Sequence, residues 1–386
     1  MFEIVEHQVS GTVIKVFGVG GAGGNAVDHM IANGVLGVEF VAANTDAQAL
    51  LRCQAKNQIQ LGSIGLGAGA KPEAGKAAAM ETREQITESL RGAHMVFITA
   101  GMGGGTGTGA APVIAEIAKE MGILTVAVVT KPFLFEGSRR RSSAESGIEE
   151  LSRHVDSVIV ILNEKLEEVL GDDVLMEEAF SSADNVLKNA VAGISEIINV
   201  PGMMNVDFQD VRTVMAEQGM AMMGSASASG VDRARIAAEQ AVASPLLEGV
   251  NLSGARGVLV NITADKSSLK MREVREIMDT IRGFAAEDAT IIHGAVYDVS
   301  MGDALRVTVV ATGLGQPLST LQATPRLVVS QKTGTDNMSM GNGFDGNAMD
   351  SLPAVMRKHR SQTVEALTNS GVDKYDIPAF LRKQAD

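Results

Sequence analysis

Residues 101–109 read Gly101-Met-Gly-Gly-Gly-Thr-Gly-Thr-Gly109, and this glycine-rich stretch decides the predicted fold. It follows the apolar run Met95–Ala100, which is typical of a buried strand, and it precedes a helical pattern that begins near Ala110. Glycine between a strand and a helix N-terminus lets backbone N–H groups close on phosphate oxygens, and the helix dipole favours the anion. Thr106 and Thr108 add hydroxyl donors. The stretch therefore predicts a phosphate-binding loop in an α/β domain.

A second glycine-rich loop, Gly18-Val-Gly-Gly-Ala-Gly-Gly-Asn25, follows the strand-like run Val13–Phe17. Two such loops in one domain predict a nucleotide whose phosphates are held from two sides. Taken alone, the loop is equally compatible with close packing of a strand on a helix. It meets the dinucleotide fingerprint only in part, because Glu39 opens the second strand and Asp46 lies beyond it, whereas the fingerprint needs an acid at the end of that strand.

Strand-like runs alternate with helical patterns through the first half of the chain. The predicted strands cover 13–19, 37–43, 58–62, 95–100, 124–130 and 157–162. The predicted helices between them lie near 24–34, 72–91, 108–121 and 138–153. This alternation predicts a mostly parallel sheet with helices on both faces. Ligands of such sheets bind at the carboxyl ends of the strands, where both glycine loops fall.

A long helix is predicted over roughly 174–199, because Leu187, Val191 and Ile194 belong to an apolar stripe with spacings of three and four residues. After it, the pattern predicts helices near 207–217, 232–243 and 269–285 and strands near 220–227, 256–264, 290–299 and 304–312. These elements form a second α/β unit, and its last two strands are expected to pair as a hairpin. The long helix is expected to join the two units.

Composition narrows the class of protein. The chain has 386 residues, of which 45 % are apolar and 42 are glycine, as suits an α/β protein of two or three domains. Its net charge of −13 argues against nonspecific nucleic-acid binding, which needs clustered Lys and Arg. Cys53 is the only cysteine, so no intrachain disulfide forms. Neither a signal peptide nor an apolar run of the roughly 20 residues that span a bilayer is expected.

The composition changes near the C-terminus. Residues 332–350 are rich in Gly, Asn, Ser and Asp, which predicts disorder. Residues 372–386 regain apolar side chains, among them Ile377 and Phe380. A short apolar motif at the end of a flexible tether is typical of a docking peptide. The residues alone leave open a fraying terminus with a few stray apolar side chains.

The run Gly-Gly-Gly-Thr-Gly-Thr-Gly at 103–109 is also the signature of the tubulin superfamily of GTPases, which this chain resembles. Four further motifs make it similar to the FtsZ family of bacterial cell-division proteins: Gly20–Asn25, Asn44–Asp46, Asn205–Asp210 and Asp376–Arg382. The resemblance runs from about residue 13 to residue 315 and resumes in the last dozen residues. Five motifs in the family's order are highly specific.

The resemblance implies a tubulin-like α/β fold. In this fold an N-terminal Rossmann-like GTP-binding domain and a C-terminal α/β domain are joined by a long central helix. On this chain the implied parts are a flexible N-terminus (1–12), a GTP-binding domain (13–173), the central helix (174–200), a C-terminal GTPase-activating domain (201–315), a disordered linker (316–371) and a docking peptide (372–386).

The family binds GTP or GDP, with Mg²⁺ bound through the phosphates and water. The implied phosphate contacts are Gly20, Gly21, Ala22, Gly23, Gly24, Asn25, Ala70, Gly104, Gly105, Thr106, Gly107 and Thr108. Ala22 stands where many relatives have glycine, and a methyl group is tolerated at this position if φ is negative. Glu136 and Arg140 match the family's contacts to the ribose and the nucleotide. Their four-residue spacing is equally that of an ordinary surface ion pair.

The resemblance assigns base recognition to the start of the long helix. Phe180 matches the residue that packs on the purine, Asp184 matches the one that reads the guanine edge, and Asn163 assists. A carboxylate accepts from both the N1–H and the exocyclic amine of guanine, and adenine offers no such pair, so GTP is expected over ATP. Two simpler interpretations are a core aromatic at Phe180 and a solvated helix face at Asp184.

The resemblance assigns hydrolysis to Asp207 and Asp210, with Asn205 beside them, acting on the γ-phosphate of the neighbouring subunit. Hydrolysis then requires a polymer. Two carboxylates at i and i+3 share a helix face, where they orient and polarise a water molecule. The alternative is structural, with Asp207 as an N-cap and Asp210 complementing the helix dipole. Capping and catalysis are compatible for Asp207.

The expected function is GTP-dependent, head-to-tail assembly into filaments of the division ring, in the cytoplasm at mid-cell. The implied partners are copies of this chain and membrane tethers such as FtsA and ZipA, bound through residues 372–386. Neither nucleic-acid binding nor direct insertion into the membrane is expected. Two features depart from the family pattern: the stretch Leu61–Ala70 is a few residues short, and Lys71 stands where Asn is common. Nucleotide turnover or polymer dynamics is therefore expected to differ.

Two other classes of protein compete with this interpretation. A Rossmann-type oxidoreductase needs an acidic ribose ligand at the end of the second strand and a catalytic His or Tyr in a second domain, and neither is evident in the sequence. A tubulin-like scaffold that binds GTP without hydrolysing it is the closer alternative. Asp207 and Asp210 argue against it.

Overall fold

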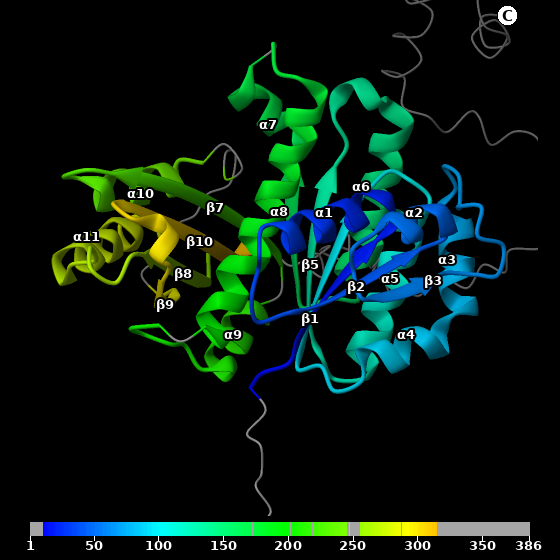
Figure 1. Ribbon diagram of the computed structural model, residues 1–386, viewed down its shortest axis with the longest axis horizontal. Helices are drawn as coiled ribbons and strands as arrows, with labels where there is room; N and C mark the ends of the chain where they lie inside the picture. Colours follow the sequence, from blue (N-terminus) through cyan, green and yellow to red (C-terminus); the bar gives the residue numbers. More distant parts are fainter. Residues whose placement is uncertain are drawn as a thin grey trace, which may run out of the picture. The chain divides into compact units, whose positions relative to one another are not determined.

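The computed structural model describes residues 11–171, 173–200, 202–217, 219–244, 247, 255–286 and 288–314. The predicted linker 316–371 and docking peptide 372–386 lie outside these residues, as do residues 1–10 of the predicted flexible N-terminus. The described residues belong to one compact unit. Its centre is a sheet of ten strands in the order β3-β2-β1-β4-β5-β6-β7-β10-β8-β9 (Figure 1).

The first six strands confirm the predicted parallel sheet. They are β1 (Ile14–Val19), β2 (Glu39–Asn44), β3 (Asn57–Gln60), β4 (Met95–Gly101), β5 (Leu124–Lys131) and β6 (Ser157–Leu162). Each pairs in parallel with its neighbours, for example Val16 of β1 with Phe40 of β2 and Phe97 of β4. The strand order 3-2-1-4-5-6 is that of a dinucleotide-binding fold, which places the binding crevice between β1 and β4.

The strands are buried on both faces, as their continuous apolar runs predict. Successive side chains of a strand point to opposite faces, so Met95 and Phe97 of β4 pack into one core while Val96 and Ile98 pack into the other. The first core is covered by α1 (Gly20–Ala32) and the long helix α8 (Met176–Asn199). The second is covered by α3 (Pro72–Glu81), α4 (Arg83–Leu90), α5 (Thr106–Glu120) and α6 (Ser138–Ser152).

The helices differ from the predicted ranges in three ways. The predicted helix 72–91 breaks into α3 and α4 at Thr82, whose hydroxyl donates back to the Ala78 carbonyl at 2.9 Å. Such back-bonding by threonine bends helices. Two short helices were not predicted, α2 (Ala47–Arg52) and α7 (Asn163–Leu170). The helices α1 and α5 begin at Gly20 and Thr106, inside the glycine-rich stretches, because tertiary contacts override the weak helix propensity of glycine.

The second half of the sheet corrects one expectation. Its elements are α9 (Phe208–Met215), β7 (Met220–Ser229), α10 (Arg233–Val242), β8 (Gly257–Ala264), α11 (Met271–Arg282), β9 (Thr290–Tyr297) and β10 (Ala304–Leu314). The predicted hairpin of the last two strands is wrong. β10 inserts between β7 and β8 and runs antiparallel to both, whereas β9 pairs in parallel with β8 at the edge. The hairpin was predicted because the two strands follow each other in the sequence, and that adjacency does not show whether another strand lies between them in the sheet.

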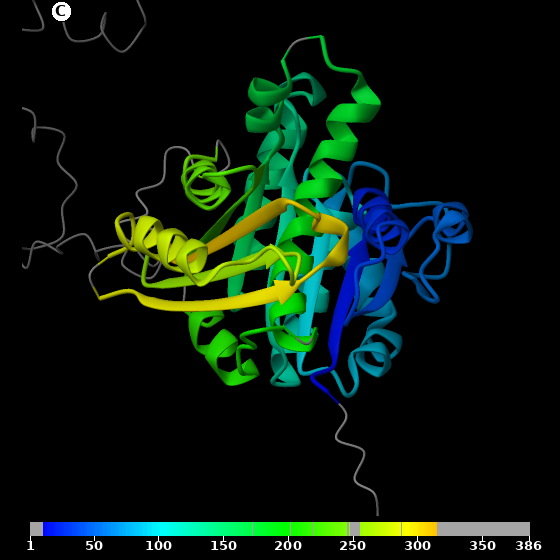
Figure 2. The ribbon, with the colours of Figure 1, turned by 60° about the vertical axis from the view of Figure 1, so that its left-hand side comes forward.

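The long helix α8 joins the two halves, as predicted. Leu187, Val191 and Ile194 are buried in the core that also contains Val126 of β5 and Val310 of β10. At its C-terminal end, the Asn199 amide donates to the Thr12 and Gly37 carbonyls at 2.9 and 2.7 Å. Figure 2 shows α8 running between the parallel strands and the smaller second half.

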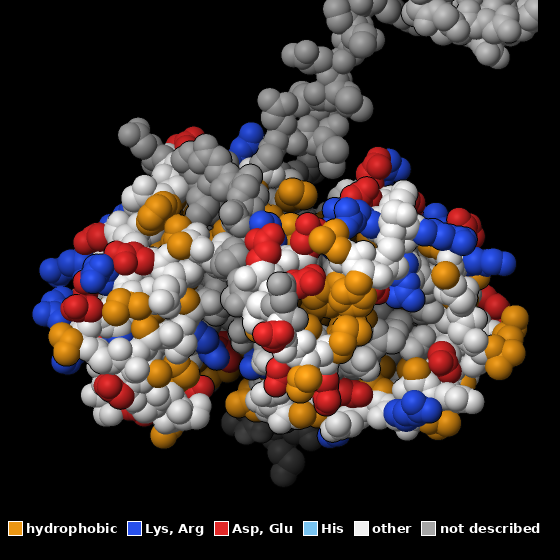
Figure 3. Space-filling model, turned by 90° about the horizontal axis from the view of Figure 1, so that it is seen from above, with side chains coloured by type: hydrophobic (Ala, Val, Ile, Leu, Met, Phe, Trp, Pro, Cys, Tyr) orange, Lys and Arg blue, Asp and Glu red, His pale blue; other side chains and the backbone are white. Residues whose placement is uncertain are grey.

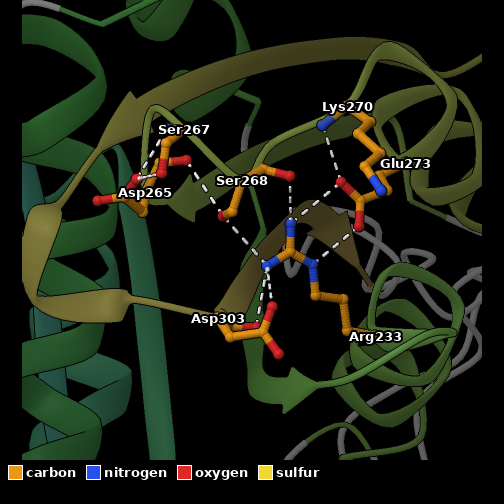
Figure 4. Close-up of polar contacts among 7 residues, drawn as sticks. All are labelled: Arg233, Asp265, Ser267, Ser268, Lys270, Glu273 and Asp303. Atoms are coloured by element: carbon orange, nitrogen blue, oxygen red, sulfur yellow. Dashed lines mark hydrogen bonds and ion pairs between the residues drawn. The ribbon is translucent and has the colours of Figure 1, made fainter.

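A buried guanidinium stabilises the second half (Figure 4). Arg233 is 3 % exposed, and its Nε and Nη2 donate to the two oxygens of Glu273 at 2.8 and 3.1 Å. Its remaining donors reach the Ser268 hydroxyl, the Ser268 carbonyl and the Asp303 carbonyl at 3.2, 2.7 and 2.9 Å. All five guanidinium donors are therefore satisfied. The network joins α10 and α11 to the turn before β10.

Burial alone would raise the pKa of Glu273, but hydrogen bonds from Arg233 and the Lys270 N–H outweigh burial and hold that pKa below its ordinary value. The stabilisation by this pair is therefore complete above the ordinary glutamate pKa of about 4.3. It is lost as the pH falls through the lower value of the folded state.

Replacing Arg233 with alanine is expected to lower the free energy of unfolding by about 3–5 kcal/mol, because the Glu273 carboxylate stays buried without its partner. Arg235 on the same helix offers a matched control, since it pairs with Glu239 at 3.0 Å on the exposed surface. Arg235→Ala is expected to cost less than about 1 kcal/mol. Urea unfolding at pH 7, followed by circular dichroism, measures both; equal losses would contradict a special role for the buried pair.

Candidate functional site

The predicted nucleotide contacts start from one edge of the sheet. Because β1, β2, β4, β5 and β6 are parallel, their carboxyl ends lie along the same edge. Each strand there leads into a predicted site segment: Gly20–Asn25, Asn44–Asp46, 102–108, Glu136–Arg140 and Asn163. Figure 3 shows the molecule from the side of this edge, where hydrophobic and charged side chains are intermixed.

The first glycine loop is held against the second by backbone contact. Gly20 has φ of +74°, a conformation that favours glycine, and a β-carbon there would lie 3.0 Å from the Gly107 nitrogen. A β-carbon on Gly23 would lie 2.4 Å from the Thr99 carbonyl oxygen. Both glycines are therefore required by packing. Ala22 has negative φ and an exposed side chain, which meets the condition stated for its methyl group.

The second loop is tightened by its own hydrogen bond. The N–H of Gly103, where φ is +105°, donates to the hydroxyl oxygen of the buried Thr108 at 2.8 Å. The hydroxyls of Thr106 and Thr45 lie 2.6 Å apart and join this loop to the segment after β2. A β-carbon on Gly107 would lie 2.5 Å from the Gly101 carbonyl oxygen. Thr108 therefore shapes the loop, whereas Thr106 links two loops at the edge.

Three glycines of the two loops are not required by the protein itself. Gly21, Gly24 and Gly104 have no positive φ, and a β-carbon on any of them would meet no described atom within 4 Å. Gly21 and Gly24 line a pocket together with Asn25 and Asn44. Space that a β-carbon would occupy is what a ligand held by backbone N–H groups needs.

The helices at the two loops begin without a side-chain cap. Neither α1 nor α5 has a side-chain acceptor for its first N–H groups, so these donors remain available to an anion. The neighbouring α2 differs, because the Asp46 carboxylate accepts from the Gln48 and Ala49 N–H groups at 2.9 and 3.3 Å. Uncapped N-termini beside open glycines fit a phosphate group.

Glu136 and Arg140 form the ion pair that their spacing predicts, at 2.7 Å. Glu136 also accepts from the Phe133 N–H at 3.0 Å. The pair is not remote from the loops, because a β-carbon on Gly103 would lie 2.8 Å from the Arg140 carbonyl oxygen. The structure thus places an ion pair beside the second glycine loop.

Phe180 is not a core residue. Its side chain is 42 % exposed, and its ring meets the buried Phe133 edge-on at 5.2 Å between centroids. The Phe135 ring stacks on Phe133, with 5.2 Å between the centroids. This aromatic cluster leaves part of the Phe180 ring open to a flat ligand. Phe133 was missed from the sequence, although the run Lys131-Pro-Phe-Leu-Phe135 directly follows β5.

Asp184 is half-buried on α8, so a fully solvated helix face does not describe it. Burial raises the pKa of Asp184 to about 6, and the charge of His29 partly offsets this rise. Asn163 is 4 % exposed, and its Oδ1 has no hydrogen-bond partner among the described residues. An unsatisfied buried amide oxygen is costly unless a ligand or water supplies a donor.

The segment Leu61–Ala70 carries exposed apolar side chains. Ile64 is 80 % exposed and Leu66 is 85 % exposed, and both Ala70 and Lys71 are exposed. The segment still reaches the second glycine loop, because a β-carbon on Gly105 would lie 2.2 Å from the Gly69 carbonyl oxygen.

The predicted hydrolytic residues lie at the opposite edge of the sheet. Phe208 of α9 contacts His94, with ring centroids 6.3 Å apart, and His94 immediately precedes β4. The second glycine loop follows the other end of β4, whose seven residues span about 23 Å. Figure 1 likewise shows α9 at the end of α8 remote from α1 and α7. The structure therefore does not bring Asp207 and Asp210 to the glycine loops of the same molecule.

Asp207, Asp210 and Asn205 are all exposed. Asp207 caps α9 and accepts from the Gln209 N–H at 3.2 Å, as the structural alternative predicts. Asn205 shapes the preceding turn by accepting from the Gly202 N–H at 2.9 Å and donating to the Val200 carbonyl at 3.0 Å. For the Asp210 carboxylate, no hydrogen bond or ion pair is found among the described residues.

Two kinds of feature are absent from the described part of the chain. It contains no group of three or more His, Cys, Asp or Glu side chains placed to hold a metal ion. It also contains no helix with the length and apolar character needed to cross a membrane.

Comparison with known proteins agrees with this geometry. Residues 13–171 match the GTPase domain of the Tubulin/FtsZ family, and residues 219–315 match the C-terminal domain of the FtsZ family. The chain is 54 % identical over 397 residues to cell division protein FtsZ of Pseudomonas aeruginosa, with 100 % of each chain covered. A solved FtsZ dimer from M. jannaschii, 43 % identical, matches with a TM-score of 0.76 over 80 % of this chain and 89 % of that one.

The fold and the two glycine loops define a tubulin-like GTPase, with a nucleotide-binding domain and a second α/β domain built on one sheet. Within that class, the chain belongs to the FtsZ family of cell division proteins. The Rossmann-type oxidoreductase is thereby excluded.

Proposed function

We propose that GTP and GDP bind at the carboxyl edge of the sheet, with the phosphates at the N-termini of α1 and α5. The observation that carries this proposal is the combination of uncapped helix N-termini with open glycines at 21, 24 and 104. The backbone of the two loops donates to the phosphate oxygens, and Asn25, Ala70 and Thr106 are proposed to contact the same phosphates. Mg²⁺ is held by the phosphates and water. Gly20, Gly23, Gly105, Gly107 and Thr108 shape the loops.

The base lies over the N-terminal half of α8. The open part of the Phe180 ring packs on the purine, and the Asp184 carboxylate accepts from the N1–H and the exocyclic amine of guanine. The unsatisfied amide oxygen of Asn163 takes a donor from the nucleotide. Glu136 and Arg140 contact the ribose and the adjoining phosphate. This arrangement favours GTP over ATP, because adenine lacks the paired donors.

Hydrolysis occurs between two molecules. The nucleotide and the acidic residues of α9 lie at opposite edges of the sheet, so α9 of one molecule meets the nucleotide of the next. This contact is heterologous, and repeated without closure it produces an open filament. Asp210, which is exposed and unpaired among the described residues, orients and polarises the attacking water together with Asp207. Asn205 holds the turn that presents them.

The division ring at mid-cell is the proposed site of action, as the names of the relatives suggest. The membrane tether is proposed to be residues 372–386, which lie outside the described residues, bound by adaptors such as FtsA and ZipA. A scaffold that binds GTP without hydrolysing it is not favoured, because residues 13–171 match a GTPase domain.

A shared site predicts complementation between two inactive variants. Asp184→Ala impairs the nucleotide end, and Asp210→Ala impairs the hydrolytic end and is expected to slow GTP turnover by about 10²–10⁴-fold while GTP binding persists. In an equal mixture with random order, about one junction in four joins two intact ends. The phosphate-release rate of the mixture is therefore expected to exceed the mean of the separate variants. A mixture with no gain, at concentrations where wild-type protein pellets with GTP, would refute a site shared between subunits.

The pKa of Asp184 predicts how nucleotide affinity depends on pH. Only the ionised carboxylate accepts both guanine donors, so GDP affinity is expected to be constant well above pH 6. Below pH 6, it is expected to fall by up to about tenfold per pH unit, because binding must first remove the proton. Titrations of GDP binding between pH 5 and 8 measure this fall. The GDP phosphate titrates in the same range, so Asp184→Asn is the control, and an equal fall in both proteins would contradict the assignment.

Deleting residues 372–386 is expected to leave GTP turnover and filament formation largely intact, because the described fold does not use them. The same deletion is expected to abolish recruitment to lipid vesicles coated with an adaptor, since a few buried apolar side chains, each worth about 1.5–3 kcal/mol, carry such binding. Co-sedimentation with adaptor-coated and bare vesicles measures it. Undiminished recruitment of the truncated protein would place the docking surface in the globular part.

A further inference from the structure

A side-chain hydrogen bond joins the helix that begins in the first glycine loop to the helix that carries Asp184. His29 of α1 and Asn185 of α8 lie 3.0 Å apart, with the ring Nε2 donating to the amide oxygen. Both side chains are half-buried. They are separated by 156 residues in the chain, so the bond is a tertiary contact between two elements of the site.

The two helices carry different parts of the proposed nucleotide site. α1 starts at Gly20, where the phosphates are proposed to bind, and α8 carries Phe180 and Asp184, which are proposed to contact the base. A nucleotide that spans both parts binds well only if the helices keep a fixed spacing. Buried apolar side chains of the two helices, including Met30 and Leu187, also share one core.

His29 also lies close enough to Asp184 for its charge to act on that carboxylate. Asn185 follows Asp184 directly in the sequence, so a hydrogen bond that fixes Asn185 fixes the turn of α8 from which Asp184 projects. The contact therefore sets both the position of α8 against α1 and the direction of its base-reading side chain.

We propose that His29 and Asn185 are positioning residues that hold Asp184 in register with the guanine edge. This inference rests on the proposed role of Asp184 in base recognition. Neither residue needs to touch the nucleotide. Their effect is on discrimination between bases, because a displaced carboxylate loses one of the two guanine donors before it loses the nucleotide.

The far end of α8 supplies a matched control. There the Asn199 amide donates to the Thr12 and Gly37 carbonyls and anchors the helix at the opposite edge of the sheet. Loss of that anchor removes two hydrogen bonds of α8, against one for the contact of His29 with Asn185, and removes them about 20 Å from Asp184. A general loosening of α8 and a local loss of register can therefore be separated.

The experiment compares the dissociation constants of GDP and IDP at pH 8, where Asp184 is ionised. IDP lacks the exocyclic amine, so the preference for GDP reports the second hydrogen bond to Asp184. His29→Ala and Asn185→Ala are each expected to reduce this preference by about 3–10-fold, the usual weight of one hydrogen bond. His29→Gln, whose amide can replace the ring N–H, is expected to retain most of it. Asn199→Ala is expected to lower the melting temperature and leave the preference unchanged.

Asp184→Ala distinguishes failure of this inference from failure of the proposed function. If Asp184→Ala keeps the full preference for GDP, base recognition by Asp184 is wrong. If Asp184→Ala loses the preference while His29→Ala and Asn185→Ala keep it, the site stands and the positioning role is overturned. A loss of preference in Asn199→Ala equal to that in His29→Ala would also overturn it, because general loosening of α8 would then explain both.

Discussion

The site depends on contact of backbone with backbone behind the glycine loops. Where α3 crosses α5, a β-carbon on Gly109 would lie 1.9 Å from the Pro72 carbonyl oxygen, and one on Gly75 would lie 2.3 Å from the Gly105 carbonyl oxygen. Real side chains do not tolerate such distances, so both helices approach through glycine. This close contact of α3 with the second loop fixes the position of the N-terminus of α5. The first N–H groups of α5 are therefore held in one place. The glycines in and around the two loops thus divide into those that packing requires and those that leave room for a ligand.

Much of the fold follows from local pattern. Apolar runs of strand length predicted all ten strands of the described sheet, and an apolar stripe with spacings of three and four residues predicted the long helix. These predictions succeed because the spacing of apolar residues within an element reflects the face that it buries. The motif at 103–109 located the second loop because the glycines that such a loop needs are neighbours in the sequence. The residues around Phe180 and Asp184, however, do not indicate whether these two side chains contact a ligand. Their partial exposure is a property of the folded edge, so only resemblance to a family singled them out.

The remaining features depend on contacts between segments distant in sequence. β10 enters between β7 and β8, and no local pattern distinguishes that order from a hairpin. Thr82 breaks a helix through its own hydroxyl, although the apolar stripe continues past it. The position of α9 opposite the glycine loops follows only from the arrangement of the whole sheet, so the residues of α9 alone do not predict it. The hydrogen bond between His29 and Asn185 could not be predicted either, because the two residues are 156 positions apart and neither local sequence indicates the contact.

The opposite placement of the loops and α9 also gives a proposed filament two unlike ends. At one end, the last molecule holds a nucleotide that no α9 covers. At the other, the last molecule presents Asp207 and Asp210 to solvent with no nucleotide to act on. The terminal nucleotide at the first end is therefore the last to be hydrolysed and the first free to exchange. The proposed shared site therefore implies that subunits are added and lost at different rates at the two ends, because the two edges of one sheet carry different parts of the site.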